Sequence, residues 1–287
     1  MRPEQRDALF EQARERSMRR QSWAEADRLW AEVIDAYRRA VHASGPVDRR
    51  DQQQLARALW RRGMLSSARG RHAEGVALGR EAVGIFEQVN DTAVAEDGNA
   101  TGPRRDGALA ELITAMVDLA EAAFAAGEPA TRVELLEQAL ATGLRTAGPP
   151  PGAGPKTREA MGTAYHNQAT ALLHRALTAA APAADAREAA MAASRASELR
   201  QNLADPSRPL SLWELANTYA VYAQCLALIH DFDRARMVLQ LGNGLAGFLG
   251  PAGAEIVAKL RVAAGMVERE QASTAGAGQR RRWGWRR

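Results

Sequence analysis

The chain has 287 residues with 38 basic and 34 acidic side chains, which gives a net charge of +4. It is long enough to bury a sizeable core. It contains neither a run of about 18 apolar residues that could cross a bilayer nor the N-terminal apolar segment of a secretory signal. The single cysteine, Cys225, excludes an intrachain disulfide framework and is typical of a reducing compartment. These features predict a cytoplasmic protein.

The excess of positive charge belongs to the C-terminal end. Five arginines, at 280–282, 286 and 287, lie in a segment from 272 onward that has no acidic residue. Taking these 5 from 38 leaves 33 basic against 34 acidic residues in the rest of the chain. The body of the protein is therefore close to neutral, and affinity for nucleic acid or another anionic partner is expected mainly from the tail.

Apolar residues recur every three or four positions along most of the chain, which is the spacing of amphipathic helices. In 22–43, Trp30 and Ile34 lie on such a stripe, and the spacing of Ser22 and Glu25 predicts a capping box at its start. No segment alternates apolar and polar residues with a period of two, so we predict no strand and an all-α fold class. Stretches with glycine, proline or polar residues interrupt this spacing and divide the chain into eleven predicted helices, near 3–20, 22–43, 50–69, 71–89, 105–126, 129–146, 156–180, 184–204, 210–229, 232–248 and 252–271.

The gaps between these helices alternate in character. Gaps within pairs are tight, as at 69–71 and 230–232. Gaps between pairs are longer and rich in proline, glycine or polar residues, as at 90–105 and 148–155. This alternation is typical of helical hairpins laid side by side.

The segment 61–86 has the apolar spacing of helices but contains five glycines, and a glycine inside a helix costs roughly 1 kcal/mol relative to alanine. Gly63, Gly70, Gly75 and Ala82 stand where the tetratricopeptide (TPR) repeat places its small residues, so this segment resembles a TPR repeat. In that family the first and third of these residues let two helices cross closely, and the second makes the turn between them. The resemblance therefore explains three of the five glycines: Gly63 and Gly75 at the helix crossing and Gly70 in the turn.

Two further segments resemble the same repeat, and 10–34 and 166–196 are looser matches. Arg132 stands in one of the two where the family has a small residue. Gly79 and Gly84 fall outside the pattern and are not explained by it. The matching small residues are Ala223 and Ala235 in 219–245, and Ala120, Gly127 and Ala139 in 116–140.

The matching points recur at about 46 to 57 residues, whereas the usual repeat has about 34. The helices and linkers would therefore be longer than in the family. The resemblance implies a right-handed α-solenoid of about five TPR-like hairpins over 1–271, with a capping helix at 252–271. The segment 272–287 would then be a flexible basic Arg/Trp tail.

The residue pattern predicts no enzyme, metal site or cofactor. His166 and His174 are eight residues apart, which is too far on a helix to hold one ion without a third ligand. We therefore interpret the histidines as surface or turn residues. Cys225 lies within an apolar stripe, where a buried and inert thiol is the usual case. Neither a glycine-rich phosphate-binding motif nor a nucleophile elbow occurs.

The TPR resemblance also implies where a partner binds, because in that family the first helix of each hairpin lines a concave groove for a peptide or a partner helix. Trp60 and Met64 would form an apolar anchor there; the alternative is that both pack against the preceding hairpin. Asn217 and Gln224 would hydrogen-bond an extended backbone or form an ordinary polar face. The family's groove positions give the predicted partner-binding residues Arg57, Trp60, Met64, Ser67, Thr114, Val117, Glu121, Phe124, Asn217, Ala220, Gln224 and Ala227.

The tail motif RRRWGWRR suggests a different kind of contact. Arginines flanking indole rings can bind phosphates with base stacking, or an anionic membrane surface. The alternative is a solvated basic end. The predicted anion-binding residues are Arg280, Arg281, Arg282, Trp283, Trp285, Arg286 and Arg287.

Two functional hypotheses follow from these patterns. The first is a non-enzymatic protein–protein interaction module, an adaptor or a regulatory sensor, that holds a partner peptide or protein in the groove. The alternative is a protein that associates with nucleic acid or an anionic membrane through its tail. Apolar ends of a solenoid would also favour a homodimer.

Overall fold

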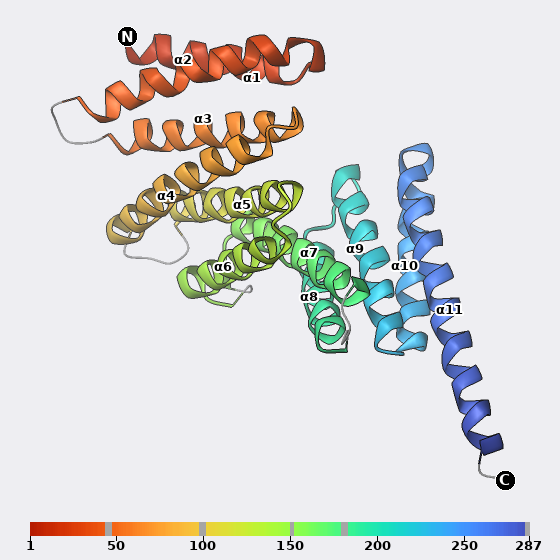
Figure 1. Cartoon of the computed structure of the whole chain (residues 1–287). Helices are drawn as coiled ribbons and strands as arrows, with labels where there is room; N and C mark the ends of the chain where they lie inside the picture. The colour runs from red at the N-terminus through yellow and green to blue at the C-terminus, as the bar shows by residue number, and fades with distance from the viewer. Residues whose placement is uncertain (44–47, 98–101, 150–151, 179–182, 285–287) are drawn as a thin grey trace. The chain divides into compact units, whose positions relative to one another are not determined.

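The computed structural model describes residues 1–43, 48–97, 102–149, 152–178 and 183–284. These residues form eleven α-helices, two short 3-10 helices and no strand (Figure 1), so the predicted all-α class is confirmed. The α-helices are α1 (Pro3–Ser17), α2 (Trp23–Val41), α3 (Arg49–Ala68), α4 (His72–Asp97), α5 (Pro103–Ala125), α6 (Pro129–Ala147), α7 (Pro155–Thr178), α8 (Ala183–Leu203), α9 (Pro209–Leu228), α10 (Phe232–Leu249) and α11 (Ala254–Gly284).

Two helices extend well beyond their predicted ends. α4 continues to Asp97 instead of ending at 89, because Val89 and Ala93 are buried against Ala108 of α5. This tertiary contact holds the polar segment after 89 in a helix. α11 continues to Gly284 instead of ending at 271, so residues 272–284 of the predicted tail are helical. Its alanine, glutamine and arginine residues are good helix formers, and it contains no proline.

The chain divides into two compact units, Met1–Ala160 and Met161–Arg287. In the first unit each helix from α1 to α6 packs on the next one along the chain, and α3 also contacts both α1 and α5 (Figure 1). In the second unit α9 packs against α8, α10 and α11. Serial packing of antiparallel neighbours is the arrangement of a helical-repeat protein.

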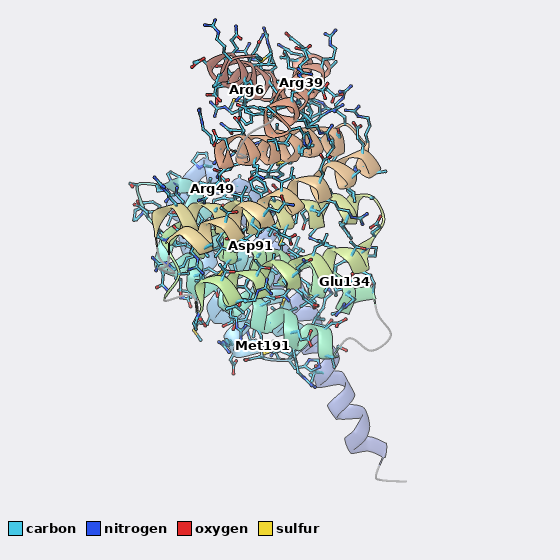
Figure 2. The ribbon with its side chains drawn as sticks, turned by 90° about the vertical axis from the view of Figure 1, so that its left-hand side faces the viewer. Arg6, Arg39, Arg49, Asp91, Glu134 and Met191 are labelled. Atoms are coloured by element: carbon cyan, nitrogen blue, oxygen red, sulfur yellow. The ribbon has the colours of Figure 1, made fainter. Side chains whose placement is uncertain are left out.

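Polar side chains tie the first hairpin of the first unit to α3. Arg6, labelled in Figure 2, donates to both carboxylate oxygens of Asp51 at 2.8 and 2.7 Å. Arg50 forms an ion pair with Asp7, which also accepts from the Tyr37 hydroxyl at 2.7 Å. The contacts between α1, α2 and α3 therefore combine a buried apolar stripe with charged pairs at its edge.

Three hairpin turns share one hydrogen-bond pattern. The turns between α3 and α4, α5 and α6, and α9 and α10 each have a residue with positive φ, namely Gly70 at 80°, Gly127 at 88° and His230 at 62°. After each of them a backbone N–H bonds back to a carbonyl five residues earlier, at 2.9 to 3.0 Å. This is the Schellman closure of a helix end. The third turn therefore places a histidine where the other two have glycine.

Replacing His230 with glycine should stabilise the second unit. A left-handed backbone conformation costs roughly 1–2 kcal/mol for a residue with a Cβ atom. The substitution also removes a ring contact with Phe232 at 5.7 Å, so we expect a net gain of about 1 kcal/mol in the free energy of unfolding. Urea denaturation measures it, and Gly127→Ala, the opposite change at the equivalent turn, should lose about as much. Equal midpoints for the wild type and both variants would contradict this account of the turns.

The glycines of α3 and α4 lie where helices approach closely, as predicted for Gly63 and Gly75. A Cβ atom on Gly63 would lie 3.1 Å from the Gly75 carbonyl oxygen, and one on Gly75 would lie 2.9 Å from the Gly63 carbonyl oxygen. Gly79, which the repeat pattern left unexplained, faces α5, where a Cβ would lie 3.0 Å from a Leu119 methyl group. At Gly84 no atom lies within 4 Å of such a Cβ. Three glycines thus allow close crossings, and the fourth has no packing role.

Candidate functional site: a groove over helix α3

A cavity of about 220 Å³ lies between α3, α4 and α5 of the first unit. Gly63, Gly75 and Gly79, the glycines of the close crossings, form part of its wall. Its lining residues are Trp60, Gly63, Met64 and Ser67 of α3, His72, Gly75 and Gly79 of α4, and Asp118, Leu119, Glu121, Ala122 and Ala125 of α5.

The indole ring of Trp60 forms a fixed wall of this cavity. Its Nε1 donates to Asp118 Oδ2 at 2.9 Å, and its ring meets Phe86 edge-on, with centroids 6.2 Å apart. The guanidinium of Arg61 lies over the ring, 4.8 Å from its centroid. These contacts come from α4, α5 and α3 itself, so Trp60 is held by its own hairpin and the next one.

Asp118 is a half-buried carboxylate that forms no ion pair among the residues that the structure describes. Burial raises its pKa, although the hydrogen bond from Trp60 and the charge of Arg61 act in the opposite direction. The nearby charge of Glu121 raises the pKa further. The fold therefore holds this carboxylate in surroundings that disfavour its ionised form.

Glu121 and Phe124 are both engaged by Arg132 of α6. Arg132 donates from Nη2 to Glu121 Oε1 at 2.7 Å and from Nε at 3.0 Å. Its guanidinium lies 4.5 Å from the centroid of the Phe124 ring. Arg132 stands where the repeat pattern expects a small residue, and the structure buries its side chain against these two partners. Phe124 does not line the cavity.

Two buried polar atoms of the lining have no hydrogen-bond partner within the described residues. They are Ser67 Oγ and His72 Nδ1. A buried polar atom without a partner costs roughly 1–3 kcal/mol, and such atoms are uncommon in folded proteins. Together with the Asp118 carboxylate, they give the cavity hydrogen-bonding capacity that the chain itself does not use.

A second cavity, of about 290 Å³, adjoins the first along α3 and shares Met64 with it. We call the two cavities together the α3 groove. Its lining residues come from α1, α2, α3, α4 and α5, and α3 contributes to both cavities. Met64 and Met18 are exposed there, at 41% and 72%. The second cavity is lined by Arg14, Ser17, Met18, Trp23, Trp30, Arg61, Met64, Leu65 and Ala68.

The structure brings together four of the predicted groove residues: Trp60, Met64, Ser67 and Glu121 all line the first cavity. Arg57 instead forms an ion pair with Glu111, Thr114 donates to the Ala110 carbonyl at 2.7 Å, and Val117 is 2% exposed. Arg57 and Thr114 thus have partners within their own unit, and Val117 is buried.

Sequence reasoning missed Asp118 and His72. Asp118 directly follows the predicted Val117, and one residue along a helix turns the side chain by about 100°. His72 is the first residue of α4, on the second helix of its hairpin, where no groove position was sought.

The predicted residues of the second unit all lie on α9. Asn217 bonds to His166 Nε2 at 3.1 Å and accepts from Lys259 Nζ at 3.1 Å. Gln224 donates to the Ala220 carbonyl at 3.3 Å. Both asparagine and glutamine therefore have partners within their own unit. Ala220 and Ala227 of the same predicted set are buried.

The structure also bears on His166 and Cys225. His166 is 8% exposed and bonds through Nδ1 to Thr218 at 3.2 Å, so its interpretation as a surface or turn residue is wrong. The pattern gave no sign of this because Asn217 and Thr218, which bond to its ring nitrogens, belong to α9, about 50 residues later. Cys225 is buried, and this burial raises the pKa of its thiol to about 12.

Metal ligands, membrane-spanning helices and the arginine-rich tail can be assessed only for the residues that the structure describes. No group of three metal-ligating side chains occurs within the described part of the chain. No helix there is both long and apolar enough to cross a membrane. The side chains of Arg280, Arg281, Arg282, Trp283, Trp285, Arg286 and Arg287 lie outside the described residues, so the tail hypothesis stays a prediction.

The serial hairpins, their shared turns and the groove over α3 define an all-α helical-repeat protein. No protein-family model matches the chain, and no curated protein matches it. The TPR-like repeats of a Podosopora anserina protein described as a kinesin light chain are 19% identical, with 87% of this chain and 99% of that chain covered and a TM-score of 0.50. BtubC (BKLC) from P. vanneervenii is 15% identical, with 86% and 91% covered and a TM-score of 0.52. These likenesses establish the fold, and the chain is an α-solenoid of TPR-like repeats.

Proposed function

We propose that this chain is a non-enzymatic protein-interaction module that binds a peptide segment of a partner protein in the α3 groove. One observation carries the proposal: four residues chosen from the repeat pattern line one cavity, whose wall also holds two buried polar atoms without partners. A helical-repeat fold supports it, since such folds offer extended surfaces for binding other proteins. The module would act as an adaptor or as the sensor part of a larger regulator.

The groove has the chemistry of a peptide site. Trp60 provides a rigid aromatic wall held by a hydrogen bond and a ring contact. Met18 and Met64 provide flexible thioethers, which adapt to differently shaped apolar side chains. The two cavities on either side of Met64 can take two side chains of one extended peptide. Rigid aromatic anchors with adaptable neighbours are typical of binding hot spots.

A peptide selection tests this proposal. A random dodecapeptide library displayed on phage is selected against the full chain, and the enriched peptides are measured by fluorescence anisotropy. Met64→Glu should weaken binding at least tenfold, because it places a charge between the two cavities. Met191→Glu is the matched control, since Met191 is 58% exposed on α8 and lies outside the groove. A selection without any enriched peptide, or equal affinity for both variants, would rule out the groove as the binding site.

A further inference from the structure

We propose that the cavity between α3, α4 and α5 binds an arginine side chain of the partner peptide, with Asp118 as its counter-ion. This inference rests on the proposed function of the α3 groove and specifies the chemistry of its ligand.

The first step is the charge of the cavity. Asp118 and Glu121 both line it, and no lysine or arginine is among its described lining residues. The ionic partner of Glu121 is Arg132 of α6, which contacts one oxygen of that carboxylate. Asp118 has only the neutral indole N–H of Trp60 as a hydrogen-bond donor in the described residues. The charge of Arg61 acts on Asp118 without forming an ion pair in the described residues, so a positive group of the ligand in direct contact with this half-buried carboxylate is the complement that the cavity lacks.

The second step is the contrast between the two cavities. Arg61 lies over the Trp60 ring and lines the second cavity together with Arg14. Arg61 therefore belongs to the lining of the second cavity and not to that of the first. The first cavity carries carboxylates and the second carries guanidinium groups. A basic side chain therefore has one favourable place in the groove, and this fixes the register in which a peptide lies.

The third step distinguishes arginine from other basic side chains. A guanidinium has five N–H donors in a planar fork. Besides the Asp118 carboxylate, the lining residues Ser67 and His72 carry polar atoms, Oγ and Nδ1, that are buried and have no partner within the described residues. Leu119 and Met64 provide apolar wall for the methylene stem. An ammonium would satisfy the carboxylate but is a compact point charge, so arginine uses more of these polar atoms.

The test begins with the same phage-displayed dodecapeptide library, selected in parallel on the wild type and on Asp118→Asn. Wild-type selections should converge on one fixed arginine next to an apolar residue, and Asp118→Asn selections should not. The best peptide is then synthesised with arginine and with citrulline, which has the same shape without the charge. Citrulline should weaken binding to the wild type at least tenfold and change binding to Asp118→Asn by less than twofold. Glu188→Gln, at an exposed position of α8, controls for the loss of one negative charge.

The stability of Asp118→Asn separates lost binding from lost folding. Because burial raises the pKa of Asp118 in the folded chain, the ionised carboxylate opposes folding as the pH rises through that pKa. Asparagine removes this charge and can still accept from Trp60. The urea midpoint of Asp118→Asn at pH 7 should therefore equal or exceed that of the wild type.

The possible results separate the two proposals. Peptides that depend on Met64 but bind equally with arginine or citrulline would overturn the arginine pocket and leave the groove intact. Enriched peptides that share an acidic or purely apolar anchor would do the same. A selection without any enriched peptide would overturn both proposals.

Discussion

Gly75→Leu is expected to lower the free energy of unfolding by about 3 kcal/mol, at the upper end of the effects of overpacking. A Cβ atom at this position would lie 2.9 Å from the Gly63 carbonyl oxygen and against the side chain of Ser67. The oxygen belongs to the backbone of α3, so it moves only if the two helices separate. Such a separation would also disturb Gly63, whose own Cβ position is 3.1 Å from the Gly75 carbonyl.

Gly84 is a matched control on the same helix, because nothing lies within 4 Å of a Cβ placed there. Gly84→Ala should raise the free energy of unfolding by up to about 1 kcal/mol through helix propensity and a less flexible unfolded chain. Urea denaturation at neutral pH measures both variants. If Gly75→Leu unfolds at the wild-type midpoint, the close crossing of α3 and α4 is not a requirement of the fold, and the repeat alignment built on it fails.

These two glycines show how far the sequence determines the fold. The apolar stripes place all eleven helices, because burying one face requires a regular spacing along each helix. The repeat alignment finds the close crossing of Gly63 and Gly75 since the small residues come at a recognisable interval. It does not find the role of Gly79, whose partner Leu119 lies on the next hairpin. The predicted end of α4 is wrong for the same reason, because its true last turns are stabilised by Ala108, which belongs to another helix.

The residues of the candidate site differ in the same way: some follow from the spacing along one helix, and others depend on contacts between helices. Trp60, Met64 and Ser67 follow from the register of one helix, and the structure places all three on one cavity. Val117 was chosen by the same register, yet α5 is turned so that Val117 is buried and Asp118 faces the cavity. A rotation of one helix by a single position exchanges these neighbours. The rotation of a helix about its axis depends on the residues that it packs against. Those residues belong to other helices, so the spacing along one helix does not predict the rotation.

The same kind of long-range contact determines a second large effect on stability. Asp27 of α2 accepts from Arg62 at 3.1 Å, from Arg69 at 2.8 Å and from Arg71 at 2.6 Å. Its side chain is 14% exposed. One carboxylate thus holds α2 to the end of α3 and to the turn that begins α4. Asp27→Asn would remove the one carboxylate that all three guanidinium groups share, while Arg62 and Arg71 would keep their contacts with Glu74 at 3.5 and 3.1 Å.

We expect Asp27→Asn to lower the free energy of unfolding by roughly 2 kcal/mol at neutral pH, less than for a fully buried pair because the arginines are partly solvated. Burial alone would raise the pKa of Asp27, but hydrogen bonds from Arg62 and Arg71, and their charges, lower it overall. A lowered folded-state pKa means that the carboxylate contributes its full stabilisation above the ordinary aspartate value of about 3.9. That contribution is lost as the pH falls below this value and through the folded-state pKa.

The stability difference between the wild type and Asp27→Asn should therefore be constant from pH 5 to 8 and shrink on acidification below about pH 4. Urea denaturation over this pH range measures it. Asp233→Asn is the control, since Asp233 is fully exposed and its ion pair with Arg236 runs along its own helix; it should change stability far less than Asp27→Asn. If Asp27→Asn costs no more than this control, solvent and Glu74, which also pairs with Arg62 and Arg71, balance the arginines instead of Asp27. The first hairpin would then be held to the second by its apolar stripe and by the ion pairs of Arg6 with Asp51 and of Arg50 with Asp7.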